Sequence, residues 1–179
     1  MKYKLVAFWL VVFGALFAFL QTRFEYHFYY IEQSQLFLFT EAYIRNKLLL
    51  PGGFSMLVAE FLVQFFIRPY VGALVTAALL TGVGVCTAGI VKRIAPISGL
   101  FILYVLPMLA LLFMHFDFNY RVQGTVCYLM MMALLCGYMR IRNELFRLVA
   151  GCVLVPVLFW LAGSIAVLFA GMVCLFEGL

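Results

Sequence analysis

A carboxylate and a histidine two residues apart, Glu25 and His27, follow directly on the first apolar run of the sequence. Such a pair could serve as a general base and its partner in proton transfer. Glu32, five residues further on, is a second candidate for the base. The alternative for Glu25 and His27 is that they are interfacial polar groups that end a helix, because aromatic residues such as the neighbouring Tyr26 are usual at a membrane surface. The alternative for Glu32 is a solvated helix start, where a carboxylate is favourable.

Residues that could bind a substrate follow in the same region. Gln35 ends a short polar run within an aromatic segment, where it could contact a sugar or a polar head group. Glu60, Gln64 and Arg68 are spaced four residues apart, so they share one face of a helix. Arg68 could bind a lipid phosphate. The alternative is an interfacial helix that turns its polar side to water.

A second polar loop contains Asp117 and Arg121, close to His115. It could complete a site with the first loop, or it could be a hydrated loop with no chemical role. Two ligands do not define a metal site, so we predict neither a metal nor a cofactor. The five cysteines all fall inside apolar runs and are interpreted as buried free thiols.

The elements that position these residues are predicted to be transmembrane helices. The chain is 68% hydrophobic and 11% charged, whereas soluble domains contain about 25% charged residues. Five uncharged runs have at least 18 residues, the length at which a spanning helix is the default interpretation. We therefore expect an all-α, polytopic transmembrane helical bundle forming a single membrane domain, 1–179. Its spans lie at about 5–22, 69–91, 94–115, 120–139 and 148–176.

The outer loop, 23–68, is expected to hold two short interfacial helices, near 35–48 and 54–67. The second could instead be a sixth span. Its 14 residues reach only about 21 Å at about 1.5 Å per residue, short of the hydrocarbon core of about 30 Å. The run 148–176 is expected to lead outward again; it is longer than a bilayer requires, so it tilts, bends at Pro156 or begins as an interfacial segment.

The distribution of charge gives a partial check on this topology. With five spans and the N-terminus inside, seven basic residues lie inside and five outside, in agreement with the positive-inside rule. A six-span arrangement with the N-terminus outside gives eight inside and four outside, so the count leaves both open. The basic residues lie in short clusters between apolar runs, which argues against nucleic acid as a partner.

Three segments of the chain resemble a family of uncharacterised multi-pass membrane proteins of Bacteroides-type bacteria. They are Tyr26-His-Phe-Tyr-Tyr-Ile-Glu-Gln-Ser-Gln-Leu-Phe-Leu-Phe, Pro51-Gly-Gly-Phe and Glu60-Phe-Leu-Val-Gln-Phe-Phe. The resemblance is specific over about residues 20–75. It implies a location in the bacterial inner membrane, and it implies that this chain is the N-terminal part of a longer protein.

The predicted layout also resembles that of fold-C (GT-C) glycosyltransferases. In these enzymes a first helix is followed by a large outer loop with membrane-parallel helices. The resemblance implies that Glu25 or Glu32 deprotonates an acceptor and that Arg68 or Arg121 offsets phosphate charge on a polyprenyl-phosphate-linked sugar. The acidic pair that precedes a histidine in one branch is incomplete, because only Glu25 precedes His27.

The sequence is therefore compatible with two functions of different classes. One is a GT-C-like transferase of lipid-linked sugars at the outer face of the inner membrane. The other is a non-enzymatic membrane subunit or scaffold that packs with partner helices. Substitution of Glu25 and Glu32 separates them, because an enzyme would lose activity while still folding and a scaffold would not change.

Overall fold

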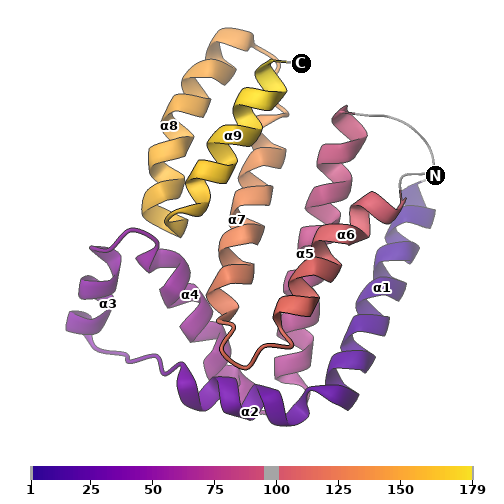
Figure 1. The fold of residues 1–179 in the computed structure, drawn as a ribbon, viewed down its shortest axis with the longest axis vertical. Helices are drawn as coiled ribbons and strands as arrows, with labels where there is room; N and C mark the ends of the chain where they lie inside the picture. The colour runs from indigo at the N-terminus through magenta and orange to yellow at the C-terminus, as the bar shows by residue number, and fades with distance from the viewer. Residues whose placement is uncertain (1, 95–100, 179) are drawn as a thin grey trace.

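The computed structural model describes residues 2–94 and 101–178 as a helical bundle. Within these residues it contains nine α-helices and one 3-10 helix (Figure 1). They are α1 (Lys2–Arg23), α2 (Glu25–Ser34), α3 (Glu41–Leu48), α4 (Gly53–Val63), η1 (Gln64–Ile67), α5 (Val71–Ile94), α6 (Phe101–Met114), α7 (Val122–Tyr138), α8 (Glu144–Ala162) and α9 (Ile165–Glu177). The all-α class is confirmed. Residues 95–100 of the expected span 94–115 lie outside the described part.

Three helices are long and apolar enough to cross a membrane, judged by length and composition. They are α1 from Tyr3 to Arg23, α5 and α8, with 21, 24 and 19 residues. At about 1.5 Å per residue they reach roughly 28 to 36 Å, close to the hydrocarbon thickness of about 30 Å. Helices α6, α7 and α9 are apolar but shorter. The three long helices indicate a membrane, while the count of five spans and the particular membrane remain predictions.

Helix α5 lies at the centre of the bundle and packs against α1, α6 and α7. Its small residues allow this close packing. The Phe28 ring lies on Gly72, where an added Cβ would come within 2.7 Å of the ring, and Trp9 lies on Gly84 at 2.6 Å. Small residues at such interfaces let two helices approach each other closely.

The segment 23–68 contains more helix than expected. Helix α2 lies across one end of the bundle and is additional to the two helices expected in this loop (Figure 1). The helix expected near 35–48 begins only at Glu41, since residues 36–40 form no helix. A helix is present near 54–67, as α4, which tightens into η1, while its interfacial position remains a prediction. Helix α4 packs against α7 and α8 inside the bundle.

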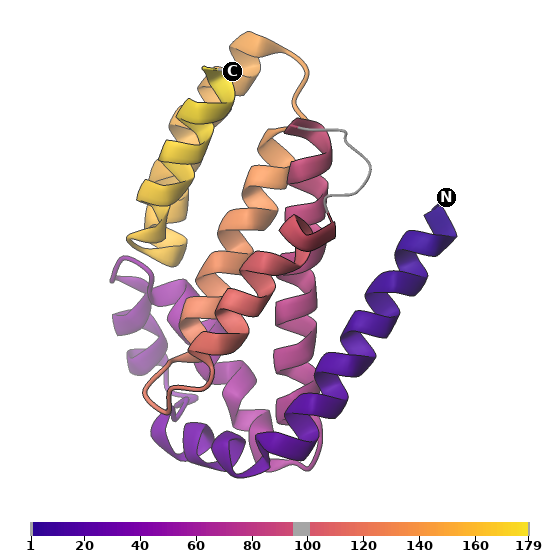
Figure 2. The same cartoon turned by 45° about the vertical axis from the view of Figure 1, so that its right-hand side comes forward.

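The apolar run 148–176 forms a hairpin, which corrects the expectation of one outward span. The turn follows α8 at Gly163, whose φ of 72° favours glycine. Helix α9 then runs back along α8 (Figures 1 and 2). Glu177 pairs with Arg147 at 2.5 Å, so both ends of the run lie at the same end of the bundle. Pro156 lies within α8 and does not end it.

Candidate functional site

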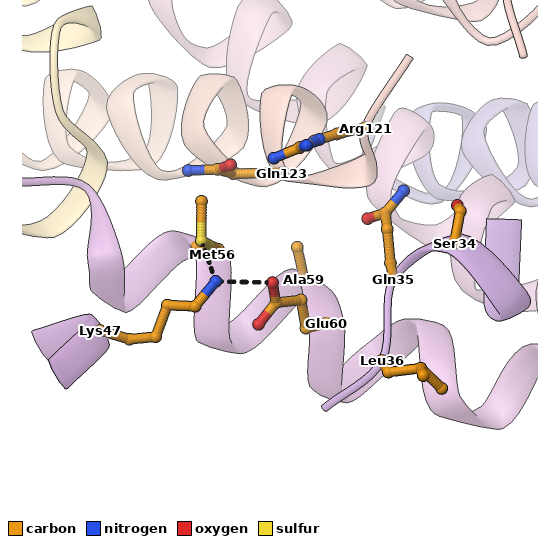
Figure 3. A pocket seen from close by; sticks show the side chains of 9 residues that line it. All are labelled: Ser34, Gln35, Leu36, Lys47, Met56, Ala59, Glu60, Arg121 and Gln123. Carbon is orange, nitrogen blue, oxygen red and sulfur yellow. Dashed lines mark hydrogen bonds and ion pairs between the residues drawn. The ribbon is translucent and has the colours of Figure 1, made fainter. Parts of the chain in front are cut away.

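A polar pocket of about 210 Å³ lies at the end of the bundle that carries α2. Four segments meet there: the end of α2, α3, α4 and the start of α7 (Figure 3). The lining residues are Ser34, Gln35, Leu36, Lys47, Met56, Ala59, Glu60, Arg121 and Gln123. Three predicted substrate-binding residues, Gln35, Glu60 and Arg121, are therefore brought together.

One wall of the pocket is an ion pair between α3 and α4. The Lys47 ammonium lies 3.0 Å from one Glu60 oxygen, and the Tyr43 hydroxyl donates to the other at 2.5 Å. Tyr43 and Lys47 are one helical turn apart, so both side chains can reach the same carboxylate. Burial, followed by the bond to Glu60, raises the pKa of Tyr43 to about 12. The Glu60 side chain is 13% exposed and is held at both oxygens.

The opposite wall comes from α7 and the residue before it. Figure 3 shows Arg121 and Gln123 across the pocket from the Lys47–Glu60 pair, with the Gln35 amide directed toward Arg121. The Gln123 amide lies 3.4 Å from the Gly52 carbonyl, at the long limit of a hydrogen bond. Within residues 2–94 and 101–178 the guanidinium of Arg121 makes no hydrogen bond or ion pair.

The balance of charge in the pocket favours an anion. Lys47 and Glu60 neutralise each other, so the unpaired Arg121 gives the lining a net positive charge. Guanidinium groups bind carboxylate and phosphate through two parallel hydrogen bonds. The amides of Gln35 and Gln123 can supply further donors. The pocket can therefore bind a small anionic group such as a phosphate.

None of the predicted catalytic residues lines this pocket. Glu25 is exposed and Glu32 is half-buried on α2, whereas His27 is buried. The His27 ring packs between the aromatic rings of Phe24 and Phe118, with centroid distances of 5.5 and 4.7 Å. Residues two apart on a helix do not face each other. The structure therefore does not bring Glu25 and His27 together as a pair, and their catalytic role remains a prediction.

His27 lies near Asp117 of the α6–α7 loop. Burial lowers the pKa of His27, and the negative charge of Asp117 partly offsets this effect. The Nε2 atom of His27 is buried and has no hydrogen-bond partner among the residues that the structure describes. Asp117 accepts a hydrogen bond from the Asn119 amide at 2.9 Å and does not line the pocket.

Glu60, Gln64 and Arg68, which were predicted to share one helical face, do not form one surface. Glu60 lines the pocket, but Gln64 donates to the Phe37 carbonyl at 2.8 Å and so contacts the non-helical segment 36–40. Arg68 follows η1 and is exposed. The 3-10 turns of η1 have about 3.0 residues per turn, so Arg68 leaves the face that the α-helical spacing predicted.

The sequence model of a protein family of unknown function matches the chain over residues 1–179. The chain belongs to DUF6057, a family of unknown function. Comparisons with curated proteins and with solved structures find no match. The resemblance to an uncharacterised family is confirmed at this level, while the glycosyltransferase-like architecture finds no support in the comparisons.

Sequence analysis missed several lining residues of this DUF6057 pocket. Lys47 and Gln123 lie in different predicted segments, and nothing in their spacing links them to Glu60. A partial signal existed on α4, because Met56, Ala59 and Glu60 are spaced as one helical face. Among the described residues no three His, Cys, Asp or Glu side chains are grouped so that they could hold a metal ion.

Proposed function

We propose that this DUF6057 protein is an integral membrane protein that binds the anionic head of an amphiphilic molecule in the pocket between α2, α3, α4 and α7. The observation that carries the proposal is the unpaired Arg121 guanidinium, opposite a Lys47–Glu60 pair whose charges cancel. Arg121 is exposed at the pocket, and a guanidinium with no counterion among the described residues can bind an anionic ligand through charge-assisted hydrogen bonds.

The surface of the bundle supports a bilayer environment. Large apolar side chains are exposed along α1 and α8, among them Leu10 at 65%, Val11 at 70% and Leu148 at 62%. Soluble monomers rarely expose contiguous apolar patches of more than a few hundred Å². Lipid tails would cover these helices, and an amphiphile in the bilayer could present its head at the pocket.

A phosphate on a polyprenyl carrier has the required chemistry, because it joins an anionic group to an apolar chain. We therefore keep a lipid-linked sugar as the proposed ligand. In the described lining Glu60 is the one carboxylate, and Lys47 and Tyr43 already occupy its two oxygens. A general base must be free to accept a proton, so this geometry favours binding over catalysis.

The test is a titration of the purified full chain in nanodiscs with polyprenyl phosphate and, separately, with the uncharged polyprenol. We expect Arg121→Gln to weaken binding of polyprenyl phosphate about tenfold, since it removes a charge-assisted contact. Arg45→Gln is the matched control, because Arg45 is exposed on α3 outside the pocket lining. Equal binding of polyprenol and polyprenyl phosphate, or an unchanged affinity in Arg121→Gln, would overturn the proposal.

The transferase hypothesis has its own test on the same preparation. Glu25→Gln and Glu32→Gln should leave binding of polyprenyl phosphate unchanged, because neither side chain lines the pocket. Loss of sugar transfer in either variant, with binding intact, would establish an enzymatic role for α2. If both variants keep every measured activity, the non-enzymatic scaffold is favoured.

A further inference from the structure

A larger groove of about 570 Å³ lies between the N-terminal half of α1 and the C-terminal half of α5. Figure 2 shows α1 diverging from α5 toward its N-terminal end. Leu5, Trp9 and Phe13 line the α1 side at a spacing of four residues, so they share one helical face. Val85 contributes to the α5 side. This groove lies away from the polar pocket and shares none of its residues.

The indole ring of Trp9 packs on Gly84 and forms the floor of the groove. Trp9 is 8% exposed, and a Cβ at Gly84 would come within 2.6 Å of its ring. The absence of a side chain at Gly84 thus lets the indole lie between the two helices. The walls next to it are apolar, so the groove suits a hydrocarbon chain.

Two cations, Lys92 and Arg140, line the same groove. Lys92 is in the last turn of α5, and Arg140 follows the end of α7. The Lys92 ammonium lies 5.7 Å from the ring centroid of Tyr104. In the part of the chain that the structure describes, neither cation is paired with a carboxylate. Two unpaired like charges beside one cavity favour an anion between them.

We infer that this groove binds one anionic phospholipid, with its phosphate between Lys92 and Arg140 and one acyl chain along Leu5, Trp9 and Phe13. The charges decide the class of lipid. Lysine and arginine both bind phosphate, and basic groups at helix ends attract anionic lipids. A zwitterionic lipid would bring its own ammonium group toward these two cations and would bind less tightly.

The experiment counts lipids retained by the full chain in a non-ionic detergent, using native mass spectrometry. The chain is titrated with phosphatidylglycerol, with phosphatidylethanolamine of the same acyl chains, and with glycerol phosphate. We expect one phosphatidylglycerol per chain, phosphatidylethanolamine about tenfold weaker, and no retained glycerol phosphate. The third ligand separates a lipid site from a site for free phosphate.

Variants test the two halves of the site separately. The double variant Lys92→Gln with Arg140→Gln should weaken the binding of phosphatidylglycerol about tenfold and remove its preference over phosphatidylethanolamine. The control is Arg142→Gln, because Arg142 is exposed and lies outside the lining. Val85→Trp should fill the groove and weaken both lipids. Val157→Trp is its control, since the two valines are 46% and 41% exposed.

The charge variants decide the outcome even if Val85→Trp does not fold. Equal retention of both phospholipids by the unmodified chain would overturn the inference. So would a preference for phosphatidylglycerol that survives Lys92→Gln with Arg140→Gln. Retention of glycerol phosphate as strong as that of phosphatidylglycerol would also overturn it, because the acyl chain would then contribute nothing.

Discussion

The indole N–H of Trp160 on α8 donates a hydrogen bond of 3.0 Å to the backbone carbonyl of Leu48, 112 positions earlier in the chain. A second bond runs in the opposite direction, from the Gly52 amide to the Trp160 carbonyl at 2.9 Å. Together they attach the loop between α3 and α4 to the α8–α9 hairpin. Because α3 and α4 carry Lys47 and Glu60, the hairpin supports one wall of the pocket.

Replacing Trp160 by phenylalanine tests the first of these bonds. Trp160→Phe removes the indole N–H and leaves the Leu48 carbonyl without its partner. We expect the free energy of unfolding to fall by about 1 kcal/mol, the usual contribution of one hydrogen bond. Unfolding by increasing fractions of sodium dodecyl sulfate measures it. Phe159→Leu is the control at an exposed neighbour, and equal stability of the two variants would contradict the prediction.

Gly52→Ala should destabilise the protein more strongly. Gly52 has a φ of 78°, and its Cβ would lie 3.2 Å from the Gly163 nitrogen. The left-handed backbone costs an L-residue about 1 to 2 kcal/mol, and the close approach adds to this, so we expect a total loss of about 2 kcal/mol. The same unfolding assay measures it.

Gly171→Ala provides the matched control for Gly52→Ala. Gly171 lies within α9, and an added Cβ would meet nothing within 4 Å. Alanine stabilises a helix interior by up to about 1 kcal/mol relative to glycine. We therefore expect this variant to be at least as stable as the unmodified chain. A similar loss in both variants would show that the backbone contact of Gly52 is not the cause.

The stability of the protein should depend on pH through His27. Burial lowers the pKa of His27 in the folded state, so the unfolded chain takes up a proton first as the pH falls. The stabilisation due to neutral His27 is present above about pH 6.5 and is lost as the pH falls through the lowered pKa. We expect His27→Phe to lose less stability than the unmodified chain between pH 7.5 and pH 5.

The charge of Asp117 gives a second variant for the same assay. Its carboxylate counteracts the lowering of the His27 pKa, so Asp117→Asn should make the loss of stability at low pH larger. His115 is present in all three proteins. Burial and then the charge of His27 lower the pKa of His115 to about 4, so replacing His27 also reduces the loss of stability due to His115, in the same direction. Parallel pH profiles for the unmodified chain and His27→Phe would show that His27 does not titrate in this way.

The hairpin makes a prediction about topology that differs from the interpretation of 148–176 as a single span. On a background in which the five natural cysteines are replaced, single cysteines are introduced by Tyr30→Cys, Asp117→Cys, Arg142→Cys and Gly178→Cys. If α1, α5 and α8 cross the membrane, positions 142 and 178 should react on one side and positions 30 and 117 on the other. Reaction of 178 together with 30 would contradict the hairpin.

The helical class and the approximate extents of α1, α5 and α7 follow from the apolar runs. The expected segments 69–91 and 120–139 correspond closely to α5 and α7. The hairpin in 148–176 did not follow, because Gly163 and Ser164 are residues that spanning helices also tolerate. Its turn depends on the contact with Gly52, which is distant in the sequence.

The candidate site was also predictable only in part, because some of its contacts join residues that are distant in the sequence. Gln35, Glu60 and Arg121 were assigned to loops on one side, and the structure brings them into one pocket. The contact between Lys47 and Glu60 depends on how α3 packs against α4, and no local sequence pattern indicates that packing. The spacing of Glu25 and His27 did not show that α2 turns the first outward and the second inward, and their catalytic role stays a prediction.

The packing of α4 has a consequence for the order in which the protein assembles. Helix α4 is synthesised early, yet it packs against α7 and α8, which leave the ribosome much later. Contacts between segments so far apart form slowly, because a long loop must close first. We therefore expect α4 to reach its final place only after the α8–α9 turn has been made. Ribosome-bound chains that stop before Trp160 would then leave the segment from α3 to η1 open to proteases.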